Sequence, residues 1–223
     1  AKEMTTGTYN TVLGAQAMSV GITTGDYNVA IGNAAGQVLT SGERNVLVGT
    51  AAGDALTSGD YNVAVGHGAL SAEDGHGYNT AIGYKTLNAQ NAGADAYNVA
   101  VGYNAGVAVS TGTYNVYMGG NAGDESTTGS HNVGIGADAI GGVSTASDNT
   151  AVGSSALYSI TSGTVNVAIG RNAGDSLTSG SFNVAVGKSA LAAEDAHGRN
   201  VAIGYAAFTN RWECWSSLNY WFL

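Results

Sequence analysis

The chain has 223 residues, carries a formal net charge of −9 and contains 35 Gly and no Pro, a composition unlike that of a compact globular enzyme. Its seven Lys and Arg form no basic stripe, which argues against nucleic-acid binding, and no apolar run is long enough for a transmembrane helix. An apolar content of 44% excludes simple disorder.

A repeat of about 17 residues fills most of the chain. The phrase Tyr-Asn-Val-Ala-Ile-Gly of residues 27–32 recurs, and a Gly follows four residues after every Asn. A unit of this size cannot bury its apolar face alone, so the copies are expected to stack as coils. The repeated Asn residues are Asn10, Asn28, Asn45, Asn62, Asn79, Asn98, Asn115, Asn132, Asn149, Asn166, Asn183 and Asn200.

The three residues after each Asn are predicted to form a short β-strand. The first is Val or Thr and the third is always apolar, so both lie on one face of the strand. We expect that face to be buried. The middle residue, usually Ala, is then expected to point outward and to allow another chain to approach closely.

The rest of each repeat is expected to contain a second inward-facing stretch and a sharp corner. Ala follows seven residues after the Asn in eleven copies, and the next position alternates Gly with a large apolar residue. Eight copies carry a Thr/Ser-Thr/Ser-Gly triplet, in which Gly supplies the positive φ of a tight corner.

These patterns predict an all-β fold, a parallel β-solenoid or β-roll of about twelve 17-residue coils over residues 1–210. Stacking the coils would turn the Asn column into a ladder of hydrogen-bonded amides. Residues 211–223 form a separate Trp-rich tail, interpreted as a cap, as an assembly contact or as a reading-frame artefact.

Tandem N-[TV]-A-[LIV]-G units joined by T-[TS]-G corners resemble the repeats of phage tail-fibre-type proteins. More distantly, they are similar to the head repeats of trimeric autotransporter adhesins. The resemblance implies a homotrimeric fibre segment, on a virion or a cell surface, that spaces or presents a surface binding a receptor or a cell-surface glycan. No catalytic set of side chains stands out, so neither enzymatic activity nor a cofactor is expected.

Two corners replace the triplet with Glu, Asp and His. One interpretation is a divalent-cation site, and the other is a solvated acidic corner. The spacing matches no common ligand template, which favours the solvated corner. The candidate ligands are Asp74, His76, Asp195 and His197, with Glu73 and Glu194 in the same clusters.

A column of aromatic residues precedes the Asn. Its rings are candidates for stacking on the sugars of a glycan, or on one another to stabilise neighbouring coils or a subunit contact; the second interpretation is favoured. The candidate contact residues are Tyr27, Tyr61, Tyr78, Tyr97 and Tyr114.

An alternative function from another class is ice binding, in which stacked Thr rows at the corners order water. Against it, the Thr rows are interrupted at residues 71–77, 88–96 and 192–198, and they lie at Gly corners instead of the middle of a strand face.

Overall fold

The computed structural model describes residues 6–193 and 195–209 and confirms the predicted parallel β-solenoid. Its elements are twelve three-residue strands: β1 (Thr11–Leu13), β2 (Val29–Ile31), β3 (Val46–Val48), β4 (Val63–Val65), β5 (Thr80–Ile82), β6 (Val99–Val101), β7 (Val116–Met118), β8 (Val133–Ile135), β9 (Thr150–Val152), β10 (Val167–Ile169), β11 (Val184–Val186) and β12 (Val201–Ile203).

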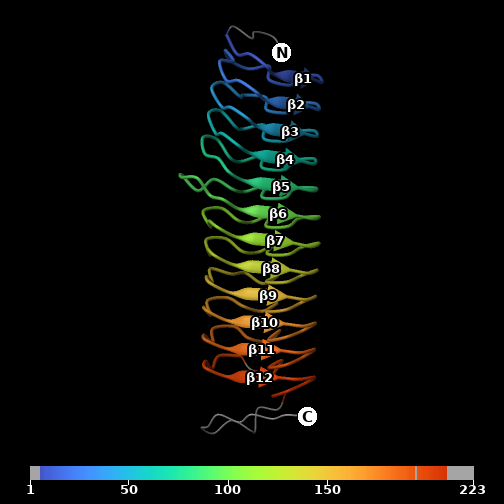
Figure 1. The fold of residues 1–223 in the computed structure, drawn as a ribbon, viewed down its shortest axis with the longest axis vertical. Coiled ribbons are helices and arrows are strands. Elements are labelled where there is room, and N and C mark those ends of the chain that lie inside the picture. The colour runs from blue at the N-terminus through green and yellow to red at the C-terminus, as the bar shows by residue number, and fades with distance from the viewer. Residues whose placement is uncertain (1–5, 194, 210–223) are drawn as a thin grey trace.

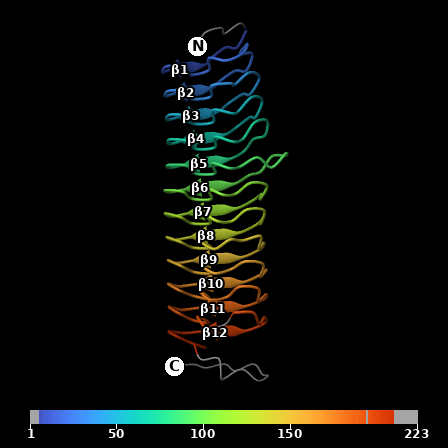
Figure 2. The same cartoon turned by 180° about the vertical axis from the view of Figure 1, so that it is seen from behind.

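The strands form one parallel sheet in which each strand pairs with the next along the chain. Figure 1 shows them stacked along the long axis of a rod, and Figure 2 shows the same stack from behind. Equivalent repeat positions pair directly, as Ala168 does with Ala185, so the register is that of the sequence repeat. Among the described residues no helix could span a membrane.

One coil is longer than the others, because Asn79 and Asn98 are 19 residues apart. The loop between β5 and β6 projects from the stack (Figure 1), and a side chain at Gly93 would meet nothing within 4 Å. The extra residues therefore bulge into solvent and leave the register of β5 with β6 intact.

The predicted orientation of the strands is wrong. The middle residue is buried in eleven of the twelve strands, whereas the first and third residues are half-buried or exposed throughout. The reason is the width of the coil. A Cβ at Gly174 would lie 3.9 Å from the Cβ of Ala168, so the interior beside the strand accepts little more than a methyl group.

The two largest middle residues, Leu47 and Tyr117, occur where glycine makes room. Leu47 is fully buried, and its methyl groups lie 2.7 Å and 2.8 Å from where a Cβ would stand at Gly36 and Gly53. Tyr117 likewise occupies the space beside Gly123. Side-chain volume is thus conserved across each section of the core, as close packing requires.

The second inward-facing stretch is confirmed. The Ala column seven residues after the Asn is buried from Ala17 to Ala190, and so are Met18, Leu70, Leu87, Ile140, Leu157 and Leu191 in the column that follows it. A third inner column lies eleven residues after the Asn and contains Leu39, Leu56, Val109, Ile160 and Leu177.

The predicted Asn ladder is also confirmed. The Oδ1 atom of Asn28 accepts hydrogen bonds from the backbone N–H and the side-chain amide of Asn45, at 2.9 Å and 3.1 Å. Asn45 Nδ2 also donates to the carbonyl oxygen of Gly59 at 2.8 Å, which ties the start of the strand to the corner. Each buried amide therefore joins two coils.

The sequence predicts a boundary between a solenoid of residues 1–210 and a tail of residues 211–223. The solenoid extends over the described residues, and the tail 211–223, with its proposed roles, lies outside them.

Candidate functional surfaces

The outward-facing side of the sheet forms a continuous, largely apolar surface, here called the apolar strand face. It consists of the first and third side chains of all twelve strands. Three of these are Thr and the others are apolar: Thr11, Leu13, Val29, Ile31, Val46, Val48, Val63, Val65, Thr80, Ile82, Val99, Val101, Val116, Met118, Val133, Ile135, Thr150, Val152, Val167, Ile169, Val184, Val186, Val201 and Ile203.

No charged side chain interrupts this face along the rod. Ile169, Met118 and Ile135 remain 43%, 40% and 38% exposed although each has a strand on both sides. At about 4.8 Å per strand and 3.3 Å per residue, the face measures roughly 58 Å by 10 Å in plan. A continuous apolar strip of this length makes the face a candidate interaction surface.

The aromatic column lies at the corner beside the start of the strands. Rings of consecutive coils stack nearly parallel, with centroid separations of 5.1 Å from Tyr61 to Tyr78, 4.9 Å from Tyr78 to Tyr97 and 5.2 Å from Tyr97 to Tyr114. The stack continues onto His131.

The stacking of neighbouring coils through these rings is therefore confirmed. Each inner ring has its faces covered by the rings above and below, so a sugar can reach only ring edges and hydroxyl groups along the stack. Tyr27 stacks on Tyr9, and Arg44 bridges the interruption, with its guanidinium 5.3 Å from the Tyr27 ring and 5.5 Å from the Tyr61 ring. Glycan binding stays a prediction.

The first hydroxyl of the corner triplets points along the stack, whereas second-position residues such as Ser41 and Ser58 are exposed. Thr40 Oγ1 donates to the carbonyl oxygen of Thr57 at 3.1 Å, and Thr161 Oγ1 donates to that of Thr178 at 3.1 Å. These hydroxyls donate their hydrogen bonds to backbone carbonyl oxygens of the next coil, as Thr and Ser commonly do in turns.

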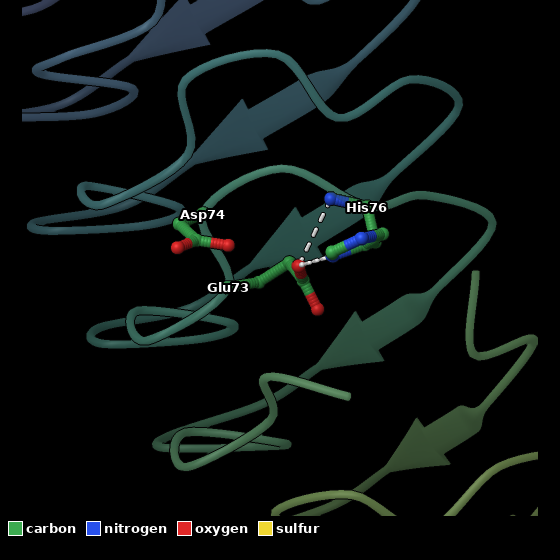
Figure 3. Close-up of side chains that lie close together, drawn as sticks. All are labelled: Glu73, Asp74 and His76. Atoms are coloured by element: carbon green, nitrogen blue, oxygen red, sulfur yellow. Dashed lines mark hydrogen bonds and ion pairs between the residues drawn. The ribbon is translucent and has the colours of Figure 1, made fainter. Parts of the chain in front are cut away.

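The corner at residues 73–76 brings carboxylates and an imidazole together. Glu73 Oε1 accepts a hydrogen bond from the His76 backbone N–H at 3.0 Å and lies 3.4 Å from His76 Nδ1. Figure 3 shows the Glu73 carboxylate between Asp74 and His76. Glu73, Asp74 and His76 each offer one possible ligand atom, and these three atoms lie within 4.8 Å of one another.

Burial makes this corner unlike an ordinary acidic turn. Glu73 is fully buried in the inner column that contains Leu56, whereas Asp74 is exposed and His76 is half-buried. Burial raises the pKa of the Glu73 carboxyl, and the His76 backbone N–H and imidazole offset that rise only in part. The interpretation as a solvated corner is wrong for Glu73.

Several buried polar atoms around Glu73 make no hydrogen bond within the described part of the chain. They include Glu73 Oε2 and His76 Nδ1, and also Nε2 of Gln90, which occupies the same inner column one coil further on. Polar atoms buried without a partner are rare in proteins and call for an explanation.

The second acidic corner repeats the backbone arrangement of the first. The carbonyl oxygens of Asp74 and Asp195 accept the backbone N–H of Thr57 and Thr178, each at 2.6 Å. The carbonyl oxygens of His76 and His197 accept Asn side-chain amides at 3.0 Å and 3.1 Å. Glu194 lies outside the described residues.

The sequence did not lead us to expect the apolar strand face or the burial of Glu73. Both have a signal in the aligned repeats. Large middle residues coincide with Gly in the facing columns, as Leu47 does with Gly53, which marks the middle position as inward. Glu73 falls eleven residues after Asn62, in register with Leu39 and Leu56.

No protein-family model matches the chain, and comparisons with curated proteins and with solved structures found no significant match.

Proposed function

We propose that this chain is a structural segment of an extracellular or virion-borne fibre, in which three copies associate through the apolar strand face. The fibre would space or present a receptor-binding surface, and the chain would have no enzymatic activity. The observation that carries the proposal is the uncharged apolar strand face, continuous over twelve strands.

Self-association is supported by the regularity of this face. A partner with the same 17-residue period can match its rows of Val and Ile coil for coil, which an unrelated globular surface cannot. With a face of roughly 600 Å² per chain, a trimer that turns three such faces toward one axis removes about 1,800 Å² of apolar face from water in all, shared among three pairwise contacts. Three copies follow from the resemblance to the head repeats of trimeric adhesins.

The ice-binding alternative draws less support. It needs rows of hydroxyls free to order water, whereas the first hydroxyl of the corner triplets, as in Thr40 and Thr161, donates to a carbonyl oxygen of the adjacent coil. The exposed columns of the sheet are mostly Val and Ile instead of Thr.

A measurement of mass in solution tests the proposal. By light scattering, the expected mass is three times the chain mass of 22.2 kDa. Ile135→Lys places a charge in the middle of the apolar strand face, where burial in a trimer is strongly unfavourable. We expect this variant to be a folded monomer with an unchanged circular dichroism spectrum.

Val143→Lys is the matched control, because Val143 is 65% exposed and lies outside the apolar strand face. It should remain trimeric. A monomeric wild-type chain would overturn the proposal, a dimer would contradict the threefold arrangement, and thermal hysteresis with ice shaping would favour the alternative.

A further inference from the structure

We propose that the corner formed by Glu73, Asp74 and His76 binds a divalent transition-metal ion, with zinc as the model ion. The donors would be the two carboxylates and the imidazole Nδ1 atom. This site lies within one chain, so it does not depend on the proposed trimer.

The spacing of the donor atoms suits such an ion. Zinc binds carboxylate oxygen and imidazole nitrogen at about 2.0–2.2 Å, so two ligands at a tetrahedral angle stand about 3.4 Å apart. Glu73 Oε1 and His76 Nδ1 are 3.4 Å apart. Asp74 follows directly in the chain, and its carboxylate completes a group of three donors within 4.8 Å.

The second observation is the burial of Glu73 without adequate compensation. Its side chain is 0% exposed, and its Oε2 atom has no hydrogen-bond partner among the described residues. Within the same part of the chain, its one ion-pair partner is His76. Because buried charges in proteins are paired or coordinate metals, a cation at this corner would account for a carboxylate in an inner column whose other buried members are uncharged.

The donor set selects the class of ion. Mg²⁺ and Ca²⁺ favour sites made of oxygen alone, whereas imidazole together with carboxylates suits zinc and its neighbours in the first transition row. Three protein donors leave a fourth position for water on the side of the exposed Asp74. Bound metal would hold this corner closed and stabilise the coil.

The test uses the full chain without an affinity tag, in a Cys214→Ser background because a thiol binds the same ions. Titration calorimetry with ZnCl₂ after treatment with EDTA is expected to show saturable binding and a higher melting temperature. Co²⁺ is expected to give the visible absorption of a low-coordinate complex with nitrogen and oxygen ligands.

His76→Gln and Glu73→Gln each remove a ligand while retaining side-chain size. Loss of an outer-shell partner alone weakens metal sites about 10- to 100-fold, so each variant is expected to weaken binding at least 10-fold. Glu73→Gln also removes the buried charge, so it should fold well without metal, which separates lost binding from lost folding.

His67→Gln is the control, because His67 is exposed and stacks on Tyr84 away from the acidic corners. His197→Gln measures any binding at the second corner. Unchanged zinc affinity in His76→Gln and Glu73→Gln, or loss of all binding in His197→Gln alone, overturns the proposal. Because light scattering reports the trimer separately, failure of the metal site and failure of the fibre proposal are distinguishable.

Discussion

At the scale of single residues, the Asn column contributes most to the specificity of the stack. Asn115 Nδ2 donates to the carbonyl oxygen of Gly129 at 2.8 Å, and Asn115 Oδ1 accepts the backbone N–H of Asn132 at 2.9 Å. An amide supplies both a donor and an acceptor at one buried point, which neither Ser nor Asp can do with the same reach.

Asn115→Ala is therefore expected to lower the free energy of unfolding by about 3 kcal/mol, because it leaves two buried backbone groups without partners. Urea denaturation followed by circular dichroism measures the loss. Asn33→Ala at an exposed position should change stability by less than about 0.5 kcal/mol. Equal effects of the two substitutions would show that the ladder is not the source of stability.

Tyr117 is a second residue with a measurable signature. Its ring is fully buried, its hydroxyl makes no hydrogen bond among the described residues, and burial raises its pKa to about 12. The neighbouring Ser126 and Asn132 side chains oppose that rise only in part. An unfolded Tyr titrates near 10, so the unfolded chain loses this proton first.

The stability linked to Tyr117 is complete below about pH 10 and is lost as the pH rises from 10 through 12. A difference of about two pKa units corresponds to roughly 3 kcal/mol. Tyr117→Phe should remove this part of the alkaline loss, as measured by urea midpoints from pH 8 to 11. Tyr158→Phe, at a position 47% exposed, should retain it. Parallel pH profiles for wild type and Tyr117→Phe would contradict the assignment.

At the scale of the coil, the size of the middle strand residue and the size of the residue that faces it across the interior compensate for each other. Where the middle of the strand is Ala, a large residue can stand opposite, and where it is Leu or Tyr, Gly stands opposite. The Gly after each strand has a different role: Gly49 has φ +134°, and a Cβ there would lie 2.5 Å from the carbonyl oxygen of Gly66 in the next coil. No side chain fits between coils at that point.

A double-mutant cycle at Leu47 and Gly53 tests this compensation in size. A Cβ at Gly53 would lie 2.8 Å from Leu47 Cδ2, and the backbone there has φ +56°. Gly53→Ala alone is expected to cost more than the 1–2 kcal/mol of left-handed strain. In a Leu47→Ala background it should cost only that strain, giving a coupling energy of about 1 kcal/mol or more in chemical denaturation.

Gly93→Ala isolates the backbone cost, because Gly93 has φ +68° and open space around it. It should match the cost of Gly53→Ala in the Leu47→Ala background. Additive effects of the Leu47 and Gly53 substitutions would mean that the two positions do not share volume.

At the scale of the whole molecule, the rod is a one-dimensional array. Each strand contacts only its sequence neighbours, and equivalent residues pair without slippage from β1 to β12. Stability then depends on the number of coils and on the interfaces between them. Every coil contributes one strand to the apolar strand face. An interface built on this face therefore grows longer with each added coil.

Deletion of residues 150–166 removes one complete coil and joins Asn149 to Val167 with the repeat intact. We expect the shortened chain to fold, with its urea midpoint close to that of the wild type. Deletion of residues 150–158 instead removes β9 and leaves eight residues between Asn149 and Val167, too few for a complete coil, so β10 cannot stack in register on β8 and the chain should be strongly destabilised. Equal stability of the two deletions would contradict a register fixed by side-chain columns.

Much of this fold follows from the sequence alone. The spacing of the Asn and Gly residues sets the coil length, the pairing of equivalent positions and the amide ladder, because stacked identical units leave their repeated polar groups facing one another. The aromatic column is also visible in the sequence, and stacking of its rings follows from the same register.

Which side of the strand faces the core was decided by tertiary structure. A period of two places Val29 and Ile31 on one face and Ala30 on the other, but hydrophobicity by itself assigns the larger pair to the interior, and the interior accepts only Ala30. The burial of Glu73 depends in the same way on the inner column contributed by neighbouring coils. Both features depend on the width of the coil interior, which is the distance between the strand and the inner columns that face it. These residues are far apart within the repeat, so the alternation along a single strand does not reveal that width.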